Sequence, residues 1–306
     1  MEHRGVFIED TFAEAFPMRA ARLIITAANE RWARQAALTL TGFATSVIGC
    51  KCEAGIERQL TPGETPDERP GVSVLLFAMD TEGLGKRLVE RIGQAVLTCP
   101  TTSCFDGLPD VDRRIPVGRA LRAFGDGFQG SKVVGGERYW RIPVMDGEFL
   151  MQESFGAVKG IGGGNFIILG RDLRATLAAA EAAVDAMAAL RGVILPFPGG
   201  IARSGSKVGS RRYKSVPATT NEAFCPTLRP LTPSSLPSDA DCVLEIVLDG
   251  LDESSIRRAM RVGIDAACRP GILAITAGNF GGTLGPHHFH LHAIMRESTA
   301  AEAARA

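Results

Sequence analysis

The sequence predicts an α+β protein in which one strand-helix-strand-strand-helix-strand unit occurs twice. The chain has 306 residues, of which 45% are hydrophobic and 22% charged, so it is long enough for two globular domains of ordinary size. Short apolar segments of strand length alternate with segments of helical period in the same order in both halves. An offset of 170 residues also sets RIG (91–93) on RVG (261–263), which is consistent with an internal duplication.

The second half shows this pattern most clearly. An Ala-rich helix is expected after Asp172, whose side chain can cap it, and Gly192 ends it. The three- and four-residue spacing predicts one apolar stripe, formed by Leu173, Leu177, Ala180, Val184, Met187 and Leu190. The expected elements are a strand over 164–170, this helix, strands over 193–201 and 242–248, a helix over 252–268 and a strand over 271–277. That order is the ferredoxin-like arrangement, an antiparallel sheet with both helices on one face.

The first half repeats the order. The predicted elements are a strand over 21–26, a helix over 29–41 that Gly42 ends, strands over 44–50 and 72–79, and a helix over 83–97. We therefore expect two ferredoxin-like lobes, an N-terminal one over 1–146 and a C-terminal one over 147–296. A frayed tail is expected over 297–306.

The charge balance gives no reason to expect nucleic acid or membrane as a partner. Lys plus Arg and Asp plus Glu number 34 each, so no global field favours either. The start of the chain, MEHRGVFIEDTF, has no apolar signal segment, and the longest uncharged stretch, 270–295, contains Gly, Pro and His residues unsuited to a spanning helix. Seven Cys, an odd number, indicate reduced core residues. We expect a cytoplasmic protein.

Glu245 is the most informative single residue. It lies in the middle of the apolar run CVLEIVL (242–248), where an unpaired ionised carboxylate would cost several kcal/mol to bury. The corresponding position of the first unit is Leu75, so the strand itself does not require an acid. Either an Arg from a neighbouring element pairs with Glu245, or the side chain faces a closed cleft and is protonated. In the second case burial raises its pKa and the neutral acid can donate a hydrogen bond.

The run HHFHLH (287–292) invites a metal-site interpretation. At strand period His288, His290 and His292 share a face, and three imidazoles can hold zinc. However, no Cys, Asp or Glu between 270 and 295 completes or orients such a site. We favour an exposed or interface strand that closes the second unit, and expect no metal.

Two further kinds of segment suggest ligand binding. Glycine-rich loops occur at GIGGGN (160–165), PGG (198–200), SGSKVGS (204–210) and GNFGG (278–282), and such backbone suits close approach by a large flat ligand. The basic loop KVGSRRYK (207–214) is either a solvated surface loop or a grip for an anionic tail. A nucleophile motif such as GxSxG is missing from the sequence, which argues against Ser-His or Cys-His covalent catalysis.

Many ordered motifs resemble one family. They include GVFIEDTFAEAF (5–16), TGFATSVI (41–48), ETPDERPGV (64–72), RIGQAVLTCPT (91–101), GEFLMQESFG (147–156), PFPGGI (196–201), SKVGS (206–210), AMRVGIDAAC (259–268) and AGNFGG (277–282). From residue 5 to 292 the chain closely resembles formylmethanofuran:tetrahydromethanopterin formyltransferases. The balanced charge and the Arg bias resemble the bacterial branch of the family found in methylotrophs.

The resemblance implies direct transfer of a formyl group between formylmethanofuran, or methylofuran, and N5 of tetrahydromethanopterin in a ternary complex. Both coenzymes are then co-substrates, and no metal or prosthetic group is expected. The catalytic acid of the family falls on Glu245. The residues expected to contact the coenzymes are Ser154, Phe155, Gly163, Asn165, Gly199, Gly200, Ser206, Lys207, Arg211, Arg212 and Asn221.

The resemblance also implies a homo-oligomer, either a dimer or a dimer of dimers, and a stable complex with amidohydrolase-type subunits. Two other functions stay open from the sequence. The chain can be a non-catalytic duplicated scaffold subunit of a formyltransferase/hydrolase complex, or the His run can serve a metal-dependent hydrolase. The net direction of transfer and the side chain of the furan coenzyme are not fixed by the sequence.

Overall fold

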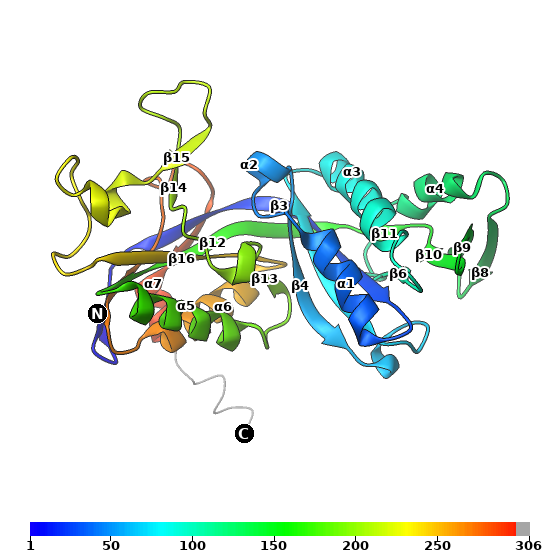
Figure 1. The fold of residues 1–306 in the computed structure, drawn as a ribbon, viewed down its shortest axis with the longest axis horizontal. Coiled ribbons are helices and arrows are strands. Elements are labelled where there is room, and N and C mark those ends of the chain that lie inside the picture. Colours follow the sequence, from blue (N-terminus) through cyan, green and yellow to red (C-terminus); the bar gives the residue numbers. More distant parts are fainter. Residues whose placement is uncertain (298–306) are drawn as a thin grey trace. The chain divides into compact units, whose positions relative to one another are not determined.

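The computed structural model describes residues 1–297 and has an α+β architecture with a large mixed sheet of 14 strands (Figure 1). Apart from Glu297, the tail expected over 297–306 lies outside the described residues. The chain forms two compact units, unit 1 with residues 1–17, 161–190 and 197 onward, and unit 2 with residues 18–160 and 191–196. The strands β3 (Phe12–Thr26) and β12 (Val158–Gly170) each contribute residues to both units.

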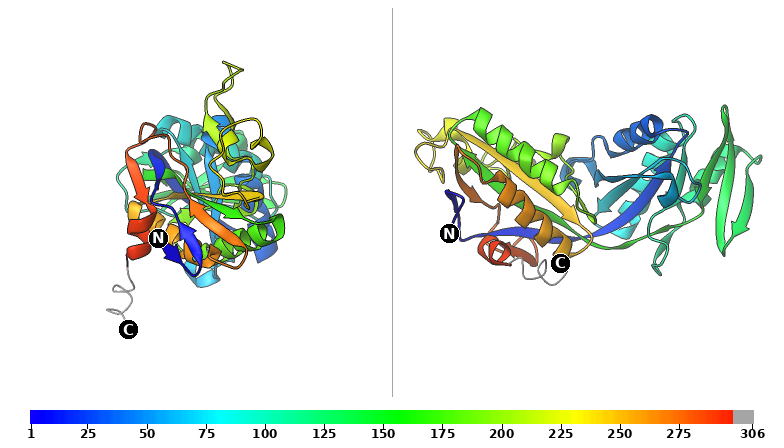
Figure 2. Two further views of the ribbon diagram at one scale, coloured as in Figure 1. Left: turned by 90° about the vertical axis from the view of Figure 1, so that its left-hand side faces the viewer. Right: turned by 90° about the horizontal axis from the view of Figure 1, so that it is seen from below.

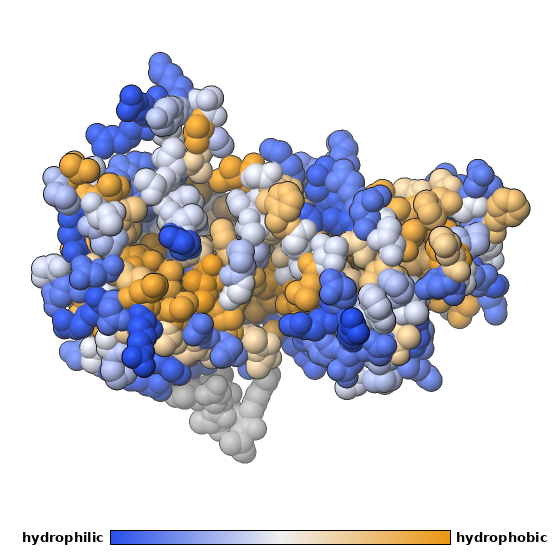
Figure 3. Space-filling view, viewed as in Figure 1, coloured by the Kyte–Doolittle hydropathy of each residue, from blue (hydrophilic) through white to orange (hydrophobic). Residues whose placement is uncertain are grey.

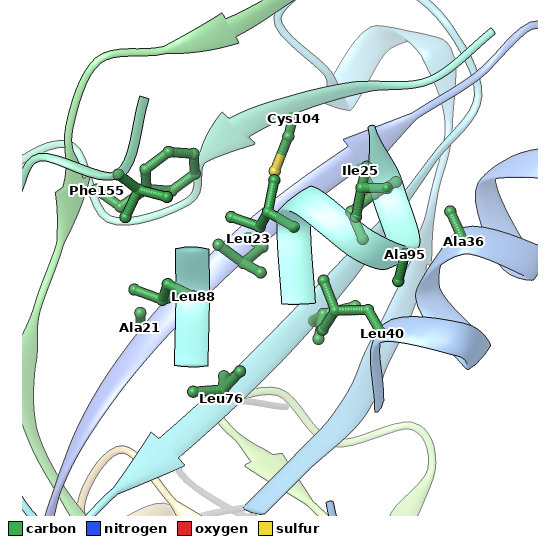
Figure 4. Close-up of a cluster of buried hydrophobic side chains, with 14 of the residues drawn as sticks. Ala21, Leu23, Ile25, Ala36, Leu40, Leu76, Leu88, Ala95, Cys104 and Phe155 are labelled. Atoms are coloured by element: carbon green, nitrogen blue, oxygen red, sulfur yellow. The ribbon is translucent and has the colours of Figure 1, made fainter. Parts of the chain in front are cut away.

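The centre of unit 2 is an antiparallel sheet in the order β6-β3-β5-β4, with two helices on one face. Its strands besides β3 are β4 (Glu53–Leu60), β5 (Gly71–Ala78) and β6 (Ser103–Asp106), and its helices are α1 (Glu30–Thr41) and α3 (Thr81–Arg91). Alternate residues of β3, including Leu23 and Ile25, meet Leu40 of α1 and Leu88 of α3 in one buried cluster (Figure 4). This cluster is the core of unit 2.

The rest of unit 2 consists of short elements around this core. They are α2 (Val47–Cys50), a π turn (Ile92–Val96), β7 (Arg114–Ile115), α4 (Val117–Leu121), β8 (Gly130–Val134), β9 (Glu137–Val144), β10 (Gly147–Gln152), β11 (Phe155–Gly156) and β13 (Val193–Ile194). The antiparallel strands β8, β9 and β10 continue the sheet from β6, to which β10 is parallel.

The strand predicted over 44–50 is wrong, because a short helix occupies its second half. The Ser46 side chain accepts a hydrogen bond from the Ile48 N–H at 3.3 Å and starts α2, and Lys51 ends it in the left-handed conformation. The strand follows as β4. The strand β4 has a polar sequence that includes a buried acid, Glu57. The Arg22 side chain donates two hydrogen bonds of 2.7 and 2.8 Å to the Glu57 carboxylate.

Unit 1 contains the antiparallel sheet β17-β12-β16, extended by two N-terminal strands. The strands are β16 (Cys242–Gly250) and β17 (Ile272–Thr276), with β2 (Val6–Ile8) parallel to β17 and β1 (Glu2–His3) beyond it. The helices α5 (Leu173–Met187) and α6 (Glu253–Ala267) lie side by side and pack on this sheet (Figure 2). The remaining elements are the hairpin β14 (Ser206–Val208) and β15 (Ala218–Thr220), the strand β18 (His287–His290) and the helix α7 (Leu291–Arg296).

Both long helices of unit 1 begin where the sequence predicts. Asp172 accepts a hydrogen bond from the Ala175 N–H, and Asp252 accepts one from the Ser255 N–H, each at 2.8 Å. The predicted strand over 193–201 is shorter than expected, because Pro198–Gly200 forms a 3₁₀ turn in which Gly199 has a φ of 63°. Three similar turns lie at Pro62–Glu64, Glu222–Phe224 and Pro226–Leu228, and a longer one at Arg122–Gly125.

The buried face of α5 agrees with the predicted stripe only in part, at Ala180 and Met187, which are buried. Leu173 and Leu177 are 63% and 38% exposed, whereas small residues such as Ala179 and Ala183 are fully buried. The reason is the neighbouring helix, since a Cβ on Gly263 of α6 would lie 2.8 Å from the sulfur of Met187. Close helix packing selects small side chains and leaves the leucines outside it.

We predict that Glu57→Ala lowers the free energy of unfolding by about 3 kcal/mol, because it leaves the half-buried Arg22 without its partner. Urea unfolding followed by circular dichroism measures the change. The matched control is Glu90→Ala, which breaks the exposed pair with Arg87 and should shift stability by less than about 0.5 kcal/mol. Equal urea midpoints for the Glu57 variant and the parent would contradict the prediction.

Candidate active site

Glu245 belongs to the face of β16 that turns away from the helices. Along the strand Leu244, Ile246 and Leu248 are buried, while Val243, Glu245 and Val247 are half-buried and line a cavity of about 180 Å³. Side chains alternate between the two faces of a strand, so the apolar run is not buried on both sides. The carboxyl group therefore sits in a cavity wall, and the helices cover the opposite face.

The Glu245 carboxyl group keeps its proton over the acidic range, up to about pH 7. Within residues 1–297 its side chain has no hydrogen-bond or ion-pair partner, which argues against the alternative of an Arg-paired structural Glu. Removal from water raises its pKa from 4.5 to about 7. The backbone is fixed firmly, because Glu245 and Ala202 exchange two N–H···O hydrogen bonds of 2.8 and 2.9 Å. A positioned acid that holds its proton can donate it as a hydrogen bond.

Glu14 is the second carboxyl group of the same cavity, and its environment is the opposite one. It is 2% exposed and accepts hydrogen bonds from the backbone N–H groups of Phe280 (2.7 Å), Gly282 (3.1 Å), Leu284 and Gly285 (2.8 Å). Desolvation alone would raise the pKa of Glu14, but these four donors outweigh it and lower the pKa below its ordinary value. The ionised side chain thus fixes the loop 278–285 as a wall of the cavity.

Asn165 holds the other end of this loop. Its amide nitrogen donates to the carbonyls of Gly163 (3.0 Å) and Gly278 (3.2 Å), and its amide oxygen accepts from the Gly278 N–H (2.6 Å). Gly163 has a φ of 88°, and a Cβ there would lie 2.9 Å from the ring of Phe16. Both residues were predicted as coenzyme contacts, and the structure places both in the cavity wall. The Asn165 amide is already occupied by protein groups.

Free polar groups line the mouth of the cavity. Ser206 and Asn221, both predicted from the sequence, lie in the wall with side chains that have no hydrogen-bond partner among residues 1–297. Arg203 lies there too and was not predicted, and neither was Glu14. The signal available for Arg203 is its position between two glycine-rich segments, PGG (198–200) and SGSKVGS (204–210).

The other predicted residues lie outside this cavity wall. Lys207 forms a short ion pair with Glu222, and Arg211 lies 3.7 Å from the same carboxylate. Arg212 stacks over Tyr213, at 5.9 Å from the ring centre. Gly199 and Gly200 shape the turn next to the Ala202–Glu245 bridge.

Ser154 and Phe155 belong to unit 2. Phe155 is fully buried in the core cluster of that unit, and the hydroxyl of Ser154 accepts a hydrogen bond of 3.2 Å from Arg114. Phe155 thus has a packing role in unit 2. For both residues the coenzyme contact stays a prediction.

The His run does not form a strand with three imidazoles on one face, so that expectation is wrong. The strand β18 ends at His290, and His292 belongs to the helix α7, where its Nε2 lies 2.8 Å from the carbonyl oxygen of Ile8. His288 and His290 instead contact the ring of Phe12, with centroids 4.7 and 5.2 Å apart. The part of the chain that the structure describes holds no group of three or more His, Cys, Asp or Glu suited to a metal ion.

The described helices include none with the length and apolar character needed to cross a bilayer.

Comparison with known proteins identifies the family. Residues 1–144 match the family model for formylmethanofuran-tetrahydromethanopterin formyltransferase, and residues 147–294 match the model for the proximal lobe of this enzyme. The chain belongs to the formylmethanofuran-tetrahydromethanopterin formyltransferase family. It is similar to the formyltransferase of Methylococcus capsulatus, with 60% identity over 295 residues that cover 95% of this chain and 98% of that protein. Identity to the Methanosarcina acetivorans formyltransferase is 52%, covering 96% and 100%.

Two solved structures of the formyltransferase family are similar to the whole chain. The formylmethanofuran:tetrahydromethanopterin formyltransferase of Methanosarcina barkeri gives a TM-score of 0.92 at 52% identity, covering 96% of this chain and 100% of that one. The formyltransferase/hydrolase complex of Methylorubrum extorquens with methylofuran gives 0.94 at 49% identity, covering 97% and 99%. The predicted family is confirmed, and it includes bacterial methylotrophs.

We predict that Glu14→Gln destabilises the protein at neutral pH by about 1–3 kcal/mol, because a single amide oxygen cannot serve four N–H donors. Since folding lowers the pKa of Glu14, its stabilisation is complete above the ordinary value of 4.5 and is lost as pH falls through the folded value. The difference in unfolding free energy between parent and variant should therefore shrink towards pH 3. Glu9→Gln, at an exposed position, is the control, and a difference that does not change with pH would oppose this role of Glu14.

Proposed function

We propose that this chain transfers a formyl group between formylmethanofuran, or methylofuran, and N5 of tetrahydromethanopterin, directly within a ternary complex in one-carbon metabolism. The observation that carries the proposal is the neutral Glu245 carboxyl group, unpaired among residues 1–297, in a cavity wall of a formyltransferase-family chain. The two coenzymes are those in the names of the related formyltransferases. The structure of the related formyltransferase/hydrolase complex contains methylofuran.

The chemistry follows from the two nitrogens. N5 of the pterin attacks the formyl carbon of the donor amide, and negative charge collects on the formyl oxygen. The Glu245 O–H donates a hydrogen bond to that oxygen. The donor C–N bond then breaks, the new C–N bond remains, and the departing amine takes the Glu245 proton, which the carboxylate regains from N5. The reverse direction uses the same steps.

The magnitude assigned to Glu245 is moderate. One donor to an oxyanion contributes a factor of about 10²–10³ in rate. The alignment of two large coenzymes supplies the larger part, because well-oriented reactions draw about 7–11 kcal/mol from proximity. Rigid walls serve that alignment, and the clamps of Glu14 and Asn165 on the loop 278–285 provide one.

The binding residues are proposed along the same lines. Gly163, Asn165, Ser206 and Asn221 form the wall nearest Glu245. The remaining proposed contacts come from the turn after β13 (Gly199 and Gly200), from the β14–β15 hairpin (Lys207, Arg211 and Arg212), and from Ser154 with Phe155, the first residue of β11. Lys207 would exchange its Glu222 partner for an anionic coenzyme tail.

The organisation of the chain belongs to the same proposal. The order β6-β3-β5-β4 with α1 and α3, and the strands β17-β12-β16 with α5 and α6, support two ferredoxin-like lobes. The two family models meet between 144 and 147, which supports a division of the sequence near residue 146. We further propose a cytoplasmic homo-oligomer, and the related formyltransferase/hydrolase complex supports association with hydrolase subunits.

We predict that Glu245→Ala lowers kcat by about 10²–10³-fold with little change in coenzyme binding, because it removes the oxyanion donor. Glu245→Gln keeps an N–H donor but cannot relay a proton, and should fall between parent and Ala. Formyl exchange by the purified chain with both coenzymes, together with binding by calorimetry, gives the two quantities. Near-parental turnover of the Ala variant would remove the catalytic role. An inactive parent would favour the scaffold alternative.

We also predict a pH dependence. The acid form of Glu245 has a pKa of about 7, so kcat should decline as pH rises above that value, and the Gln variant should lack this decline. For stability the sign follows from the raised pKa: the contribution of Glu245 is complete below 4.5 and lost as pH rises through about 7. Glu245→Gln should therefore be more stable than the parent at pH 9, in urea unfolding. Parallel stability curves for the two proteins would show that folding does not raise the pKa of Glu245 and would contradict the prediction.

A further inference from the structure

A second cavity adjoins the Glu245 cavity in unit 1. It has a volume of about 660 Å³ and shares Ala202, Arg203, Ser204, Val243 and Leu244 with the first cavity. Its other walls are mostly apolar and come from α5, from the turn after β13 and from the start of β16. Figure 3 shows hydrophobic side chains gathered over α5, where Leu173 and Leu177 are exposed. A ligand whose reacting end reaches Glu245 can continue into this groove.

Arg203 is the one cationic side chain in the walls of these two cavities, as far as the described residues show. Arg203 is exposed at the cavity surface, and within residues 1–297 it has no hydrogen-bond, ion-pair or ring partner. Three of the other cations of this segment are already engaged, since Lys207 and Arg211 lie against Glu222 and Arg212 lies over Tyr213. Lys214 lies in neither cavity wall. The guanidinium charge at the junction of the cavities is therefore uncompensated by protein groups.

The carboxyl groups around the two cavities do not neutralise Arg203. Glu245 keeps its proton up to about pH 7, and the charge of Glu14 is offset by four backbone N–H groups. Asp241, the acid in the wall of the second cavity, lies 3.3 Å from the Arg229 side chain. A ligand that enters this region meets one unpaired positive charge beside apolar walls.

The backbone of Arg203 is tied to Glu245 through the neighbouring residue. Ala202, the residue before it, exchanges two hydrogen bonds with Glu245. A group bound by the Arg203 side chain is thereby placed relative to the acid by a bonded strand pair.

We propose that Arg203 binds an anionic group, carboxylate or phosphate, on the coenzyme whose reacting end occupies the Glu245 cavity. The proposal rests on the formyl-transfer function above and adds the charge of the substrate that this site selects. A guanidinium suits either anion, because its planar N–H groups form paired hydrogen bonds to two oxygens. Desolvation is the cause of the raised pKa of Glu245, and the charge of Arg203 does not counteract it.

The test uses Arg203→Ala and Arg203→Lys in the full chain. The expected result for Arg203→Ala is a KM raised by about 10- to 100-fold for one of the two coenzymes, with kcat within about threefold, because charge-assisted hydrogen bonds to a substrate contribute binding of this size. Arg203→Lys keeps the charge without the paired geometry and should recover part of the affinity. Arg174→Ala is the control, because Arg174 is exposed, lies in neither cavity wall and has no partner among residues 1–297.

Two further measurements do not depend on turnover. Calorimetry of each coenzyme with the parent and Arg203→Ala should show the same loss of affinity, and the loss should be smaller at high ionic strength. Inorganic phosphate and glutarate should each be tried as competitive inhibitors of the parent. The anion that inhibits the parent more strongly than Arg203→Ala identifies the group that Arg203 binds.

The outcomes separate the two proposals. Values of KM and Kd within twofold of the parent for both coenzymes would overturn the role of Arg203, even with Glu245→Ala inactive. Conversely, parental turnover of Glu245→Ala would end the proposed chemistry and leave a loss of coenzyme affinity in Arg203→Ala standing as evidence for the anion site. Equal losses in Arg203→Ala and Arg174→Ala would also overturn the inference, because general surface charge would then explain both.

Discussion

Two glutamates share the wall of one cavity in unit 1, and the number of hydrogen-bond donors around each decides its protonation state. Glu14 accepts four backbone N–H groups and is ionised, whereas Glu245 has no donor among residues 1–297 and keeps its proton to about pH 7. Two carboxyl groups in the wall of one cavity thus carry opposite charge states. The ionised residue orders the loop that encloses the cavity, and the neutral one remains free to donate to a substrate.

The architecture makes this arrangement possible because the helices cover only one face of the sheet. The helices α5 and α6 pack closely through small residues and bury Phe166 and Leu248, which leaves the other face of β12 and β16 to carry polar groups. On that face Asn165 and Glu245 occupy neighbouring strands, two residues apart in the pairing register. Because side chains alternate along β12 and β16, one face of these strands packs against the helices and the other face carries the polar groups of the cavity.

Local signals in the sequence were sufficient for the long helices α1, α5 and α6, but not for the short helices α2, α4 and α7. The caps at Asn29, Asp172 and Asp252 and the glycine after residue 41 act over a few residues, so they could be read directly. Glu245 was found because a carboxylate stands out in an apolar run. The strand β4 was missed, because its buried Glu57 depends on Arg22, which lies 35 residues away.

Long-range partners account for the rest of what the sequence did not show. Glu14 resembles any acid of a polar N-terminal segment until its partners, 266 to 271 residues further along, are known. No sequence motif distinguishes Arg203 from other exposed arginines. The structure distinguishes it, because Arg203 lies in the walls of both cavities. The family resemblance supplied Glu245 as the acid but could not say which charges around it were already compensated.

The separation between Glu14 and its loop has a consequence for biosynthesis. The carboxylate leaves the ribosome well before the amides it binds, which follow 266 to 271 residues later in the chain. Unit 2 can form its core from residues 18–160 well before that, since domains fold as they emerge. The wall of the cavity is completed only after residue 285 has been made, so a chain interrupted before that point can keep the core of unit 2 while the cavity in unit 1 lacks one wall.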